Sequence, residues 1–170
     1  MGPLYLVTDR SVVADGDIVK AVRLALLGGV RAVQLREKDL GAHKLFELAV
    51  ELRALTNEHG ALLFINDRLD VALLVDADGI HLGQNSFSAK EARPHLRPHL
   101  NKGMLIGVST HSLAEAKRAE ADGADFVTFG PVYATPSKAA YGEPVGVSSL
   151  KEAASVLKIP VFAIGGMTRA

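Results

Sequence analysis

The sequence contains no cysteine and no tryptophan, and its 19 Lys and Arg residues balance 19 Asp and Glu residues over 170 positions. The lack of cysteine excludes disulfides, thiolate metal sites and a cysteine nucleophile. Zero net charge argues against nucleic acid or an anionic membrane as the main partner, although a local cluster of cations can still hold a small anion. No apolar run approaches the roughly 20 residues of a membrane span, and residues 4–10 lack the pattern of a secretory signal. We therefore expect a cytoplasmic protein.

Short apolar runs alternate with longer amphipathic stretches. The runs are too short for helices, and near-continuous apolarity is typical of parallel strands that are covered on both faces. The predicted strands are residues 4–7, 32–35, 62–65, 79–82, 104–108, 126–129 and 161–164. The predicted helices are residues 17–27, 42–59, 69–75, 112–121 and 148–157, with a weaker one before Pro94. Ser88, Ser112 and Ser148 are the expected N-caps.

One local pattern, in which a helix stop is followed by a small polar step and a buried strand, occurs three times. Its three copies are residues 29–35, 77–82 and 123–129. Such a repeated βα unit predicts an α/β fold with right-handed crossovers. A doubly wound sheet is the alternative, but no glycine-rich dinucleotide loop follows the first strand. Polar residues at nearly every strand end favour a TIM (β/α)8 barrel, and we expect one barrel domain over residues 1–170.

The residues that end the predicted strands include groups that bind anions. Gln34, Arg36 and Lys38 share one face if the chain stays extended, and two cations with an amide can hold phosphate or pyrophosphate. In isolation such charges are more often solvated and paired, here with Glu37 and Asp39. Because polar residues end nearly every predicted strand, we favour an anion-binding site over solvated, paired charges.

Other strand ends offer complementary chemistry. Asn66-Asp67 supplies oxygens of the kind that Mg²⁺ accepts beside a substrate phosphate, although such a pair is more often a turn or a helix cap. Gly165-Gly166 leaves backbone N–H groups open to an anion, with a plain helix-initiating turn as the alternative. His111 suits acid–base chemistry because imidazole titrates near neutrality, with a capping or packing role as the alternative. His81 lies inside a strand and is expected in the core.

In these motifs the sequence resembles the thiamine phosphate synthase family and its close relatives, the thiazole tautomerases. The motifs run in family order and are together specific for the superfamily. They comprise residues 4–9, 33–38, 65–68, 77–84, 106–112, 129–138 and 163–168. The resemblance implies a TIM barrel and a transferase of thiamine biosynthesis. That enzyme couples hydroxymethylpyrimidine diphosphate to thiazole phosphate and releases pyrophosphate, so its partners are small phosphorylated molecules.

The resemblance also implies a role for each matching residue. The groups that would contact the pyrimidine diphosphate are Gln34, Arg36, Lys38, Asn66, Ser109 and Lys138. The groups that would hold the thiazole phosphate are Thr135, Ser137 and Gly166. Arg36 and Lys138 are the expected catalytic residues because they would stabilise the charge of the departing pyrophosphate. Asp67 would bind the Mg²⁺ cofactor.

Two features depart from the synthase pattern. Ser86 stands where that pattern has a second Mg²⁺-binding aspartate, and residues 85–88 look more like the tautomerase branch, in which His111 would be the catalytic residue that moves the proton. The family also has an eighth strand and a final helix after the Gly-Gly loop, and we expect this chain to lack that βα unit. The leading interpretation is a synthase. A tautomerase and a non-catalytic phosphate-ligand-binding or regulatory barrel are the alternatives, and a homo-oligomer stays open.

Overall fold

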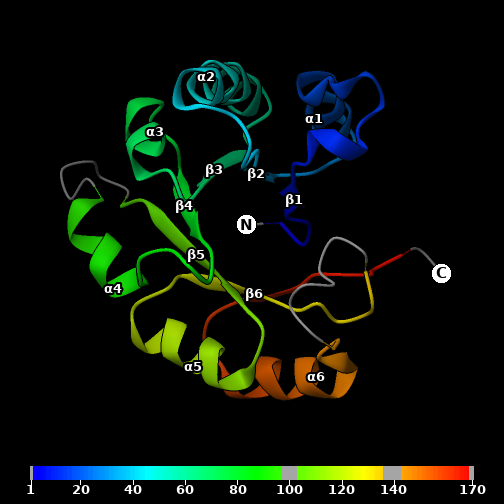
Figure 1. The fold of residues 1–170 in the computed structure, drawn as a ribbon, viewed down its shortest axis with the longest axis vertical. Helices are drawn as coiled ribbons and strands as arrows, with labels where there is room; N and C mark the ends of the chain where they lie inside the picture. The colour runs from blue at the N-terminus through cyan, green and yellow to red at the C-terminus, as the bar shows by residue number, and fades with distance from the viewer. Residues whose placement is uncertain (1, 97–102, 136–142, 169–170) are drawn as a thin grey trace. The chain divides into compact units, whose positions relative to one another are not determined.

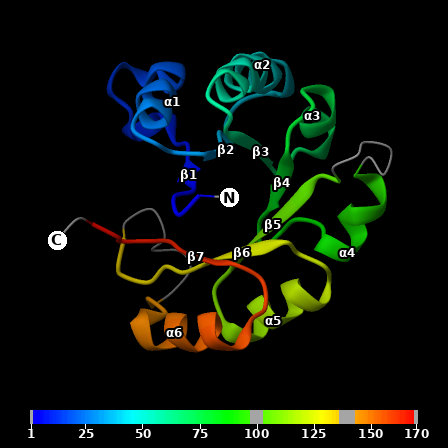
Figure 2. The same ribbon diagram turned by 180° about the vertical axis from the view of Figure 1, so that it is seen from behind.

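The computed structural model describes residues 2–96, 103–135 and 143–168. The described chain forms two compact units. The first comprises residues 2–81 with 96 and 103–104, and the second comprises residues 82–95, 105–135 and 143–168. Each unit alternates strands with helices (Figures 1 and 2).

The first unit contains a parallel sheet with helices on one side of it (Figure 1). Its elements are β1 (Leu6–Val7), η1 (Arg10–Val12), η2 (Ala14–Gly16), α1 (Ile18–Leu27), β2 (Ala32–Leu35), α2 (Ala42–Glu58), β3 (Leu62–Asn66), α3 (Leu69–Leu74) and β4 (Gly79–Leu82), whose last residue belongs to the second unit. Strand pairs follow chain order, with Leu6 opposite Val33 and Val33 opposite Leu63. All four residues of β2 are buried, as expected for a strand covered on both faces.

The second unit repeats this arrangement (Figure 2). Its elements are α4 (Ala89–Ala92), η3 (Arg93–His95), β5 (Leu105–Thr110), α5 (Leu113–Ala121), β6 (Phe126–Phe129), α6 (Gly146–Val156) and β7 (Val161–Ala163). β5 pairs with β6 and β6 with β7, again in parallel, and β6 is buried throughout. The described residues therefore form an α/β fold with seven parallel strands in chain order, which confirms the α/β class and the seven strands of the prediction.

The predicted boundaries needed several corrections. β1 begins at Leu6 rather than at residue 4, and β5 runs on to Thr110 because its pairing with β6 continues to Phe129. Ser88 and Ser112 are N-caps as predicted, each accepting from the backbone N–H three residues later. Ser148 is not an N-cap. The N–H of Val145 donates to the carbonyl of Pro131, and the chain enters α6 directly after that contact.

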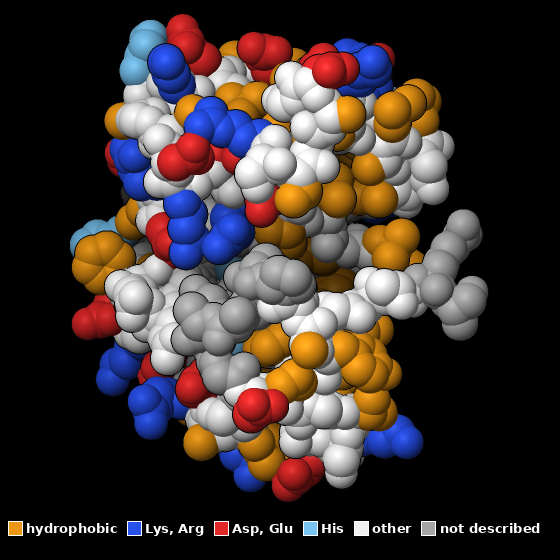
Figure 3. Space-filling model, turned by 45° about the vertical axis from the view of Figure 1, so that its right-hand side comes forward, with side chains coloured by type: hydrophobic (Ala, Val, Ile, Leu, Met, Phe, Trp, Pro, Cys, Tyr) orange, Lys and Arg blue, Asp and Glu red, His pale blue; other side chains and the backbone are white. Residues whose placement is uncertain are grey.

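The surface shows no segregation of charge on the face drawn in Figure 3, where basic and acidic side chains are interspersed. This distribution agrees with the zero net charge of the sequence. Among the described helices, none combines the length and the apolarity that a membrane span requires.

An aspartate at the start of a repeat ties each unit together. Asp78, before β4, accepts from the N–H of Leu63 at 2.8 Å and from Nη1 of Arg53 at 2.6 Å, both through Oδ2. The second unit has the same arrangement: Asp125 accepts from the N–H of Ile106 and from Nη2 of Arg93, both at 2.7 Å. Each carboxylate thus joins a neighbouring strand to a cationic side chain with charge-assisted hydrogen bonds.

We expect Asp78→Ala to lower the free energy of unfolding by about 2–3 kcal/mol, because it removes the carboxylate that pairs with the largely buried Arg53 cation and accepts from the Leu63 N–H. Urea unfolding measures the change. Glu51→Ala, on the exposed face of α2, is the matched control and should change stability by less than about 0.5 kcal/mol. Equal unfolding midpoints for the two variants would show that the carboxylate is not a structural tie.

Candidate functional site

A chain of polar side chains links the ends of β2 and β3. Gln34 is only 2% exposed, and its Nε2 donates to Oδ1 of Asn66 at 2.9 Å. Asn66 in turn donates from Nδ2 to Oδ2 of Asp67 at 2.8 Å. The structure therefore brings these three predicted site residues together, and the two amides fix the orientation of the carboxylate.

Asp67 adopts an uncommon backbone conformation with φ +58°. Asn and Asp enter this left-handed region more readily than other non-glycine residues, yet it still costs about 1 kcal/mol or more. The N–H of Asp67 donates to the carbonyl of His81 at 2.9 Å, and this bond holds the residue at the end of β3. Strain of this kind is typical of residues whose side chain has a functional position.

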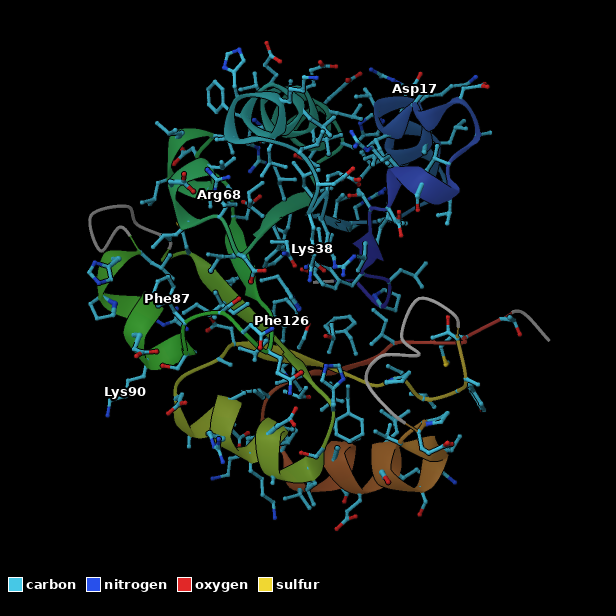
Figure 4. The ribbon with its side chains drawn as sticks, viewed as in Figure 1. Asp17, Lys38, Arg68, Phe87, Lys90 and Phe126 are labelled. Atoms are coloured by element: carbon cyan, nitrogen blue, oxygen red, sulfur yellow. The ribbon has the colours of Figure 1, made fainter. Side chains whose placement is uncertain are left out.

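Arg36 and Lys38 follow β2 after its last residue, Leu35. The N–H of Arg36 donates to Oγ1 of the buried Thr8 at 2.9 Å, and the N–H of Thr8 donates to the carbonyl of Gln34 at 3.0 Å. Thr8 therefore holds the chain beyond the strand, which the sequence did not indicate. Lys38 is exposed and lies on the side of β2 away from α2 (Figure 4).

A cavity of about 280 Å³ opens beside these residues within the first unit. Its lining comprises Leu35, Glu37, Lys38, Leu40, Leu45, Asn66, Asp67 and Arg68. Arg68 (labelled in Figure 4) donates to both carboxylate oxygens of Asp70, at 2.9 and 2.6 Å. These hydrogen bonds lower the pKa of Asp70 and raise the pKa of Arg68. The cavity thus combines hard oxygen donors with cationic side chains.

The donor set at this cavity limits how Mg²⁺ could bind. Among the described residues, no cluster of three or more His, Cys, Asp or Glu side chains could form a cage for a metal ion. Mg²⁺ usually binds through only one or two carboxylates and keeps waters and substrate phosphates as its other ligands. Asp67, fixed by Asn66, fits an ion of that kind, shared with a phosphate ligand.

Ser86 has a different role from a metal ligand in the turn after β4. Its hydroxyl accepts from the N–H of Gly83 at 2.9 Å, and its N–H donates to the carbonyl of Gly83 at 3.1 Å. Both bonds close the turn that leads to α4. With Ser109, Ser86 also lines a cavity of about 390 Å³ within the second unit.

Ser109 and His111 lie at the end of β5 in the second unit. Ser109 pairs with Thr128 on β6, whose Oγ1 lies 3.4 Å from the Ser109 hydroxyl. The N–H of His111 donates to Oε2 of Glu115 at 2.7 Å, and its Nδ1 contacts the carbonyl of Gly130. Because a carbonyl only accepts, Nδ1 carries a proton in this contact.

Two glycines follow β7 where two loops pack backbone to backbone. Gly165 and Gly166 have φ +94° and +67°, and a Cβ at Gly166 would lie 2.6 Å from Cβ of Tyr133 and 2.8 Å from the carbonyl oxygen of Ala134. The N–H of Tyr133 donates to the carbonyl of Gly165 at 3.0 Å. This close approach to Tyr133 and Ala134 requires glycine. Two predicted site residues, Ser137 and Lys138, lie outside the described residues.

His81 belongs to the core of the first unit, as predicted, with 1% of its surface exposed. Its Nδ1 lies 3.2 Å from the phenolic oxygen of Tyr5, and the Tyr5 ring packs edge-on against Phe64 with 5.3 Å between the ring centroids. Burial raises the pKa of Tyr5 well above its usual value, so the phenol stays neutral. The three rings therefore pack together in the core of the first unit beside β4, and we assign no acid–base role to them.

Comparisons with known proteins agree with one another. The profile of a family described as thiamine monophosphate synthase matches residues 4–170. A putative thiamine-phosphate synthase of Geobacter sulfurreducens is 54% identical over 167 residues, which cover 98% of this chain and 76% of the relative. A thiamine-phosphate synthase of Moorella thermoacetica is 43% identical over 96% of this chain and 76% of its own length. The solved thiamine phosphate pyrophosphorylase from Pyrococcus furiosus has a TM-score of 0.85 and 38% identity, covering 96% of this chain and 75% of that one.

We expect Gly166→Ala to lower the free energy of unfolding by at least about 2 kcal/mol, because Tyr133 and Ala134 would have to move. Gly123→Ala is the matched control, since Gly123 has φ +90° but a Cβ added there would meet no neighbouring atom within 4 Å. The control should lose only about 1 kcal/mol, the cost of a left-handed alanine. Equal losses in urea unfolding would mean that the loop contact does not require glycine.

Proposed function

The chain belongs to the thiamine monophosphate synthase family, and from this premise we propose that it joins hydroxymethylpyrimidine diphosphate to thiazole phosphate and releases pyrophosphate. The relatives named above are thiamine-phosphate synthases, which are transferases. The observation that carries the proposal is the hydrogen-bonded chain from Gln34 through Asn66 to Asp67, with Arg36 and Lys38 beyond the same strand end.

The chemistry that this site would perform is the transfer of a pyrimidinylmethyl group from the diphosphate to the thiazole nitrogen. The bond between the methylene carbon and the diphosphate oxygen breaks, and a bond from that carbon to the thiazole nitrogen forms. Negative charge then accumulates on the leaving diphosphate, and fixed donors that face this charge lower the barrier. Arg36, Lys38 and the amides of Gln34 and Asn66 would be those donors.

The same proposal assigns the remaining residues. Asp67 would hold Mg²⁺, which when bound neutralises part of the diphosphate charge. Ser109 and Lys138 would add contacts to the diphosphate, and Thr135, Ser137 and the backbone at Gly166 would hold the thiazole phosphate. The close contact between the Gly165-Gly166 turn and residues 132–134 supports the last assignment, because a phosphate needs N–H groups in a fixed arrangement.

For the architecture, we propose an eight-unit (β/α)8 barrel in one domain, to which the seven described strands belong. Support comes from the parallel pairing in chain order and from the likeness to the Pyrococcus furiosus structure. In such barrels the segments that follow the strands build the active site, which agrees with the placement of the polar residues.

A thiazole tautomerase is the second candidate, and His111 is the observation that favours it. The contact with the Gly130 carbonyl fixes the proton on Nδ1 and leaves Nε2 basic, as a proton-transfer residue requires. Ser86, which has a hydroxyl in place of a carboxylate, also agrees with that branch.

The deciding experiment supplies the purified chain with hydroxymethylpyrimidine diphosphate, thiazole phosphate and Mg²⁺. Formation of thiamine phosphate and pyrophosphate supports the synthase. Isomerisation of a thiazole carboxylate phosphate, without any coupling product, would replace it by the tautomerase. Binding of the phosphorylated ligands without either reaction would favour a non-catalytic barrel.

We expect Arg36→Ala and Lys138→Ala each to weaken binding of the pyrimidine diphosphate by about 10- to 100-fold. Each removes a charge-assisted contact worth about 1.5–3 kcal/mol when desolvated. Isothermal titration calorimetry measures the affinity, with Lys44→Ala on the exposed start of α2 as the control. Wild-type affinity in both variants would reject the anion site.

We expect His111→Ala to abolish any tautomerase activity and to lower synthase turnover by less than about tenfold, because only the tautomerase reaction needs a positioned base. His43→Ala, which removes an exposed histidine of α2, controls for loss of an imidazole elsewhere. A loss of synthase turnover as large as the loss of isomerisation would place His111 in the coupling reaction itself.

A further inference from the structure

The buried carboxylate of Glu37 has one oxygen that the fold does not explain. The residue is 5% exposed, and its Oε2 accepts from the backbone N–H of Arg10 at 3.1 Å. Its Oε1 is buried and has no hydrogen-bond partner among the described residues. An unmatched buried charge is costly, because it loses its hydration and gains nothing in return. We therefore expect a ligand, such as a cation, to contact this oxygen.

Glu37 lines the same cavity as Asp67, so two carboxylates border one space of about 280 Å³. They come from different strand ends, Glu37 from beyond β2 and Asp67 from beyond β3. A water molecule takes up about 30 Å³ in the liquid, so the cavity has room for an ion together with several waters. The amide oxygen of Asn66 is already engaged by Gln34, which leaves the carboxylates as the stronger donors.

The charges around the cavity favour a cation. Four charged side chains line it, of which Glu37 and Asp67 are anionic. Arg68 is matched by the two-fold hydrogen bond to Asp70, which lies outside the lining. The charges that remain are the two carboxylates and the ammonium group of Lys38, so the lining carries one net negative charge. Two hard carboxylates in a water-accessible cavity are the ligand set of a divalent cation such as Mg²⁺.

We propose that Glu37 is the second carboxylate of a divalent-cation site in this cavity, beside Asp67. The proposal rests on the proposed function only for the identity of the ion as Mg²⁺. It also accounts for Ser86, whose hydroxyl closes the turn with Gly83 and supplies no charge to a metal. The carboxylate that the synthase pattern has at that position is here provided from the end of β2.

The test measures binding of Mn²⁺, as a paramagnetic substitute for Mg²⁺, to the full chain with inorganic pyrophosphate present. Electron paramagnetic resonance reports the free ion. Glu37→Gln keeps the side-chain size and an acceptor for the Arg10 N–H, and it should weaken Mn²⁺ binding at least about tenfold, as should Asp67→Asn. Glu51→Gln removes a carboxylate from the exposed face of α2, outside the cavity lining, and it should change the affinity by less than about twofold.

Wild-type Mn²⁺ affinity in Glu37→Gln would overturn the proposal. If that variant does not fold, the wild-type chain decides by nuclear magnetic resonance. Bound Mn²⁺ should broaden the amide signals of Arg10 and Glu37 and spare that of Glu51, whereas equal intensities would overturn the site.

The outcome is separable from that of the proposed function. Weakened Mn²⁺ binding in Asp67→Asn but not in Glu37→Gln rejects only the second carboxylate. Weakened binding in both variants, from a wild-type chain that forms no product from the two substrates, rejects the synthase and keeps the cation site.

Discussion

Parallel pairing of neighbouring strands is the constraint on which the rest of this structure depends. Two adjacent parallel strands need a crossover between them, so every segment that leaves a strand does so at the same edge of the sheet. In the first unit this brings Gln34 of β2 within hydrogen-bond distance of Asn66 of β3, although 32 positions separate them in the sequence. These two candidate site residues are thus brought together by topology, without a local sequence motif.

The same constraint makes buried polar atoms expensive. Strands that are covered on both faces leave little water within reach, so each polar group must find its partner inside the protein. Asp78 and Asp125 meet this demand with backbone N–H groups and arginine side chains, and Gln34 meets it through Asn66. Glu37 does so with one oxygen only. That exception is the observation on which the proposed second carboxylate of the cation site rests.

Much of this arrangement was predictable from the sequence, because periodicity and capping are local signals. Apolar runs gave the strands, and the Ser-to-Glu spacing at Ser88 and Ser112 gave two N-caps. Ser148 carries a similar signal but was a wrong prediction, since a backbone contact of Val145 with Pro131 starts the helix earlier. The burial of Glu37 was also missed. In the sequence it is one charge within a charged run, and only the β1 loop that packs over it shows that it is enclosed.

The central claim is that the carboxyl ends of the strands hold a diphosphate. Titration of the isotopically labelled chain with inorganic pyrophosphate and Mg²⁺, followed by amide nuclear magnetic resonance, tests it most directly. We predict that the largest shifts fall on residues 34–38 and 66–68 of the first unit, at the ends of β2 and β3. Shifts confined to helix surfaces, or none at saturating pyrophosphate, would contradict the account.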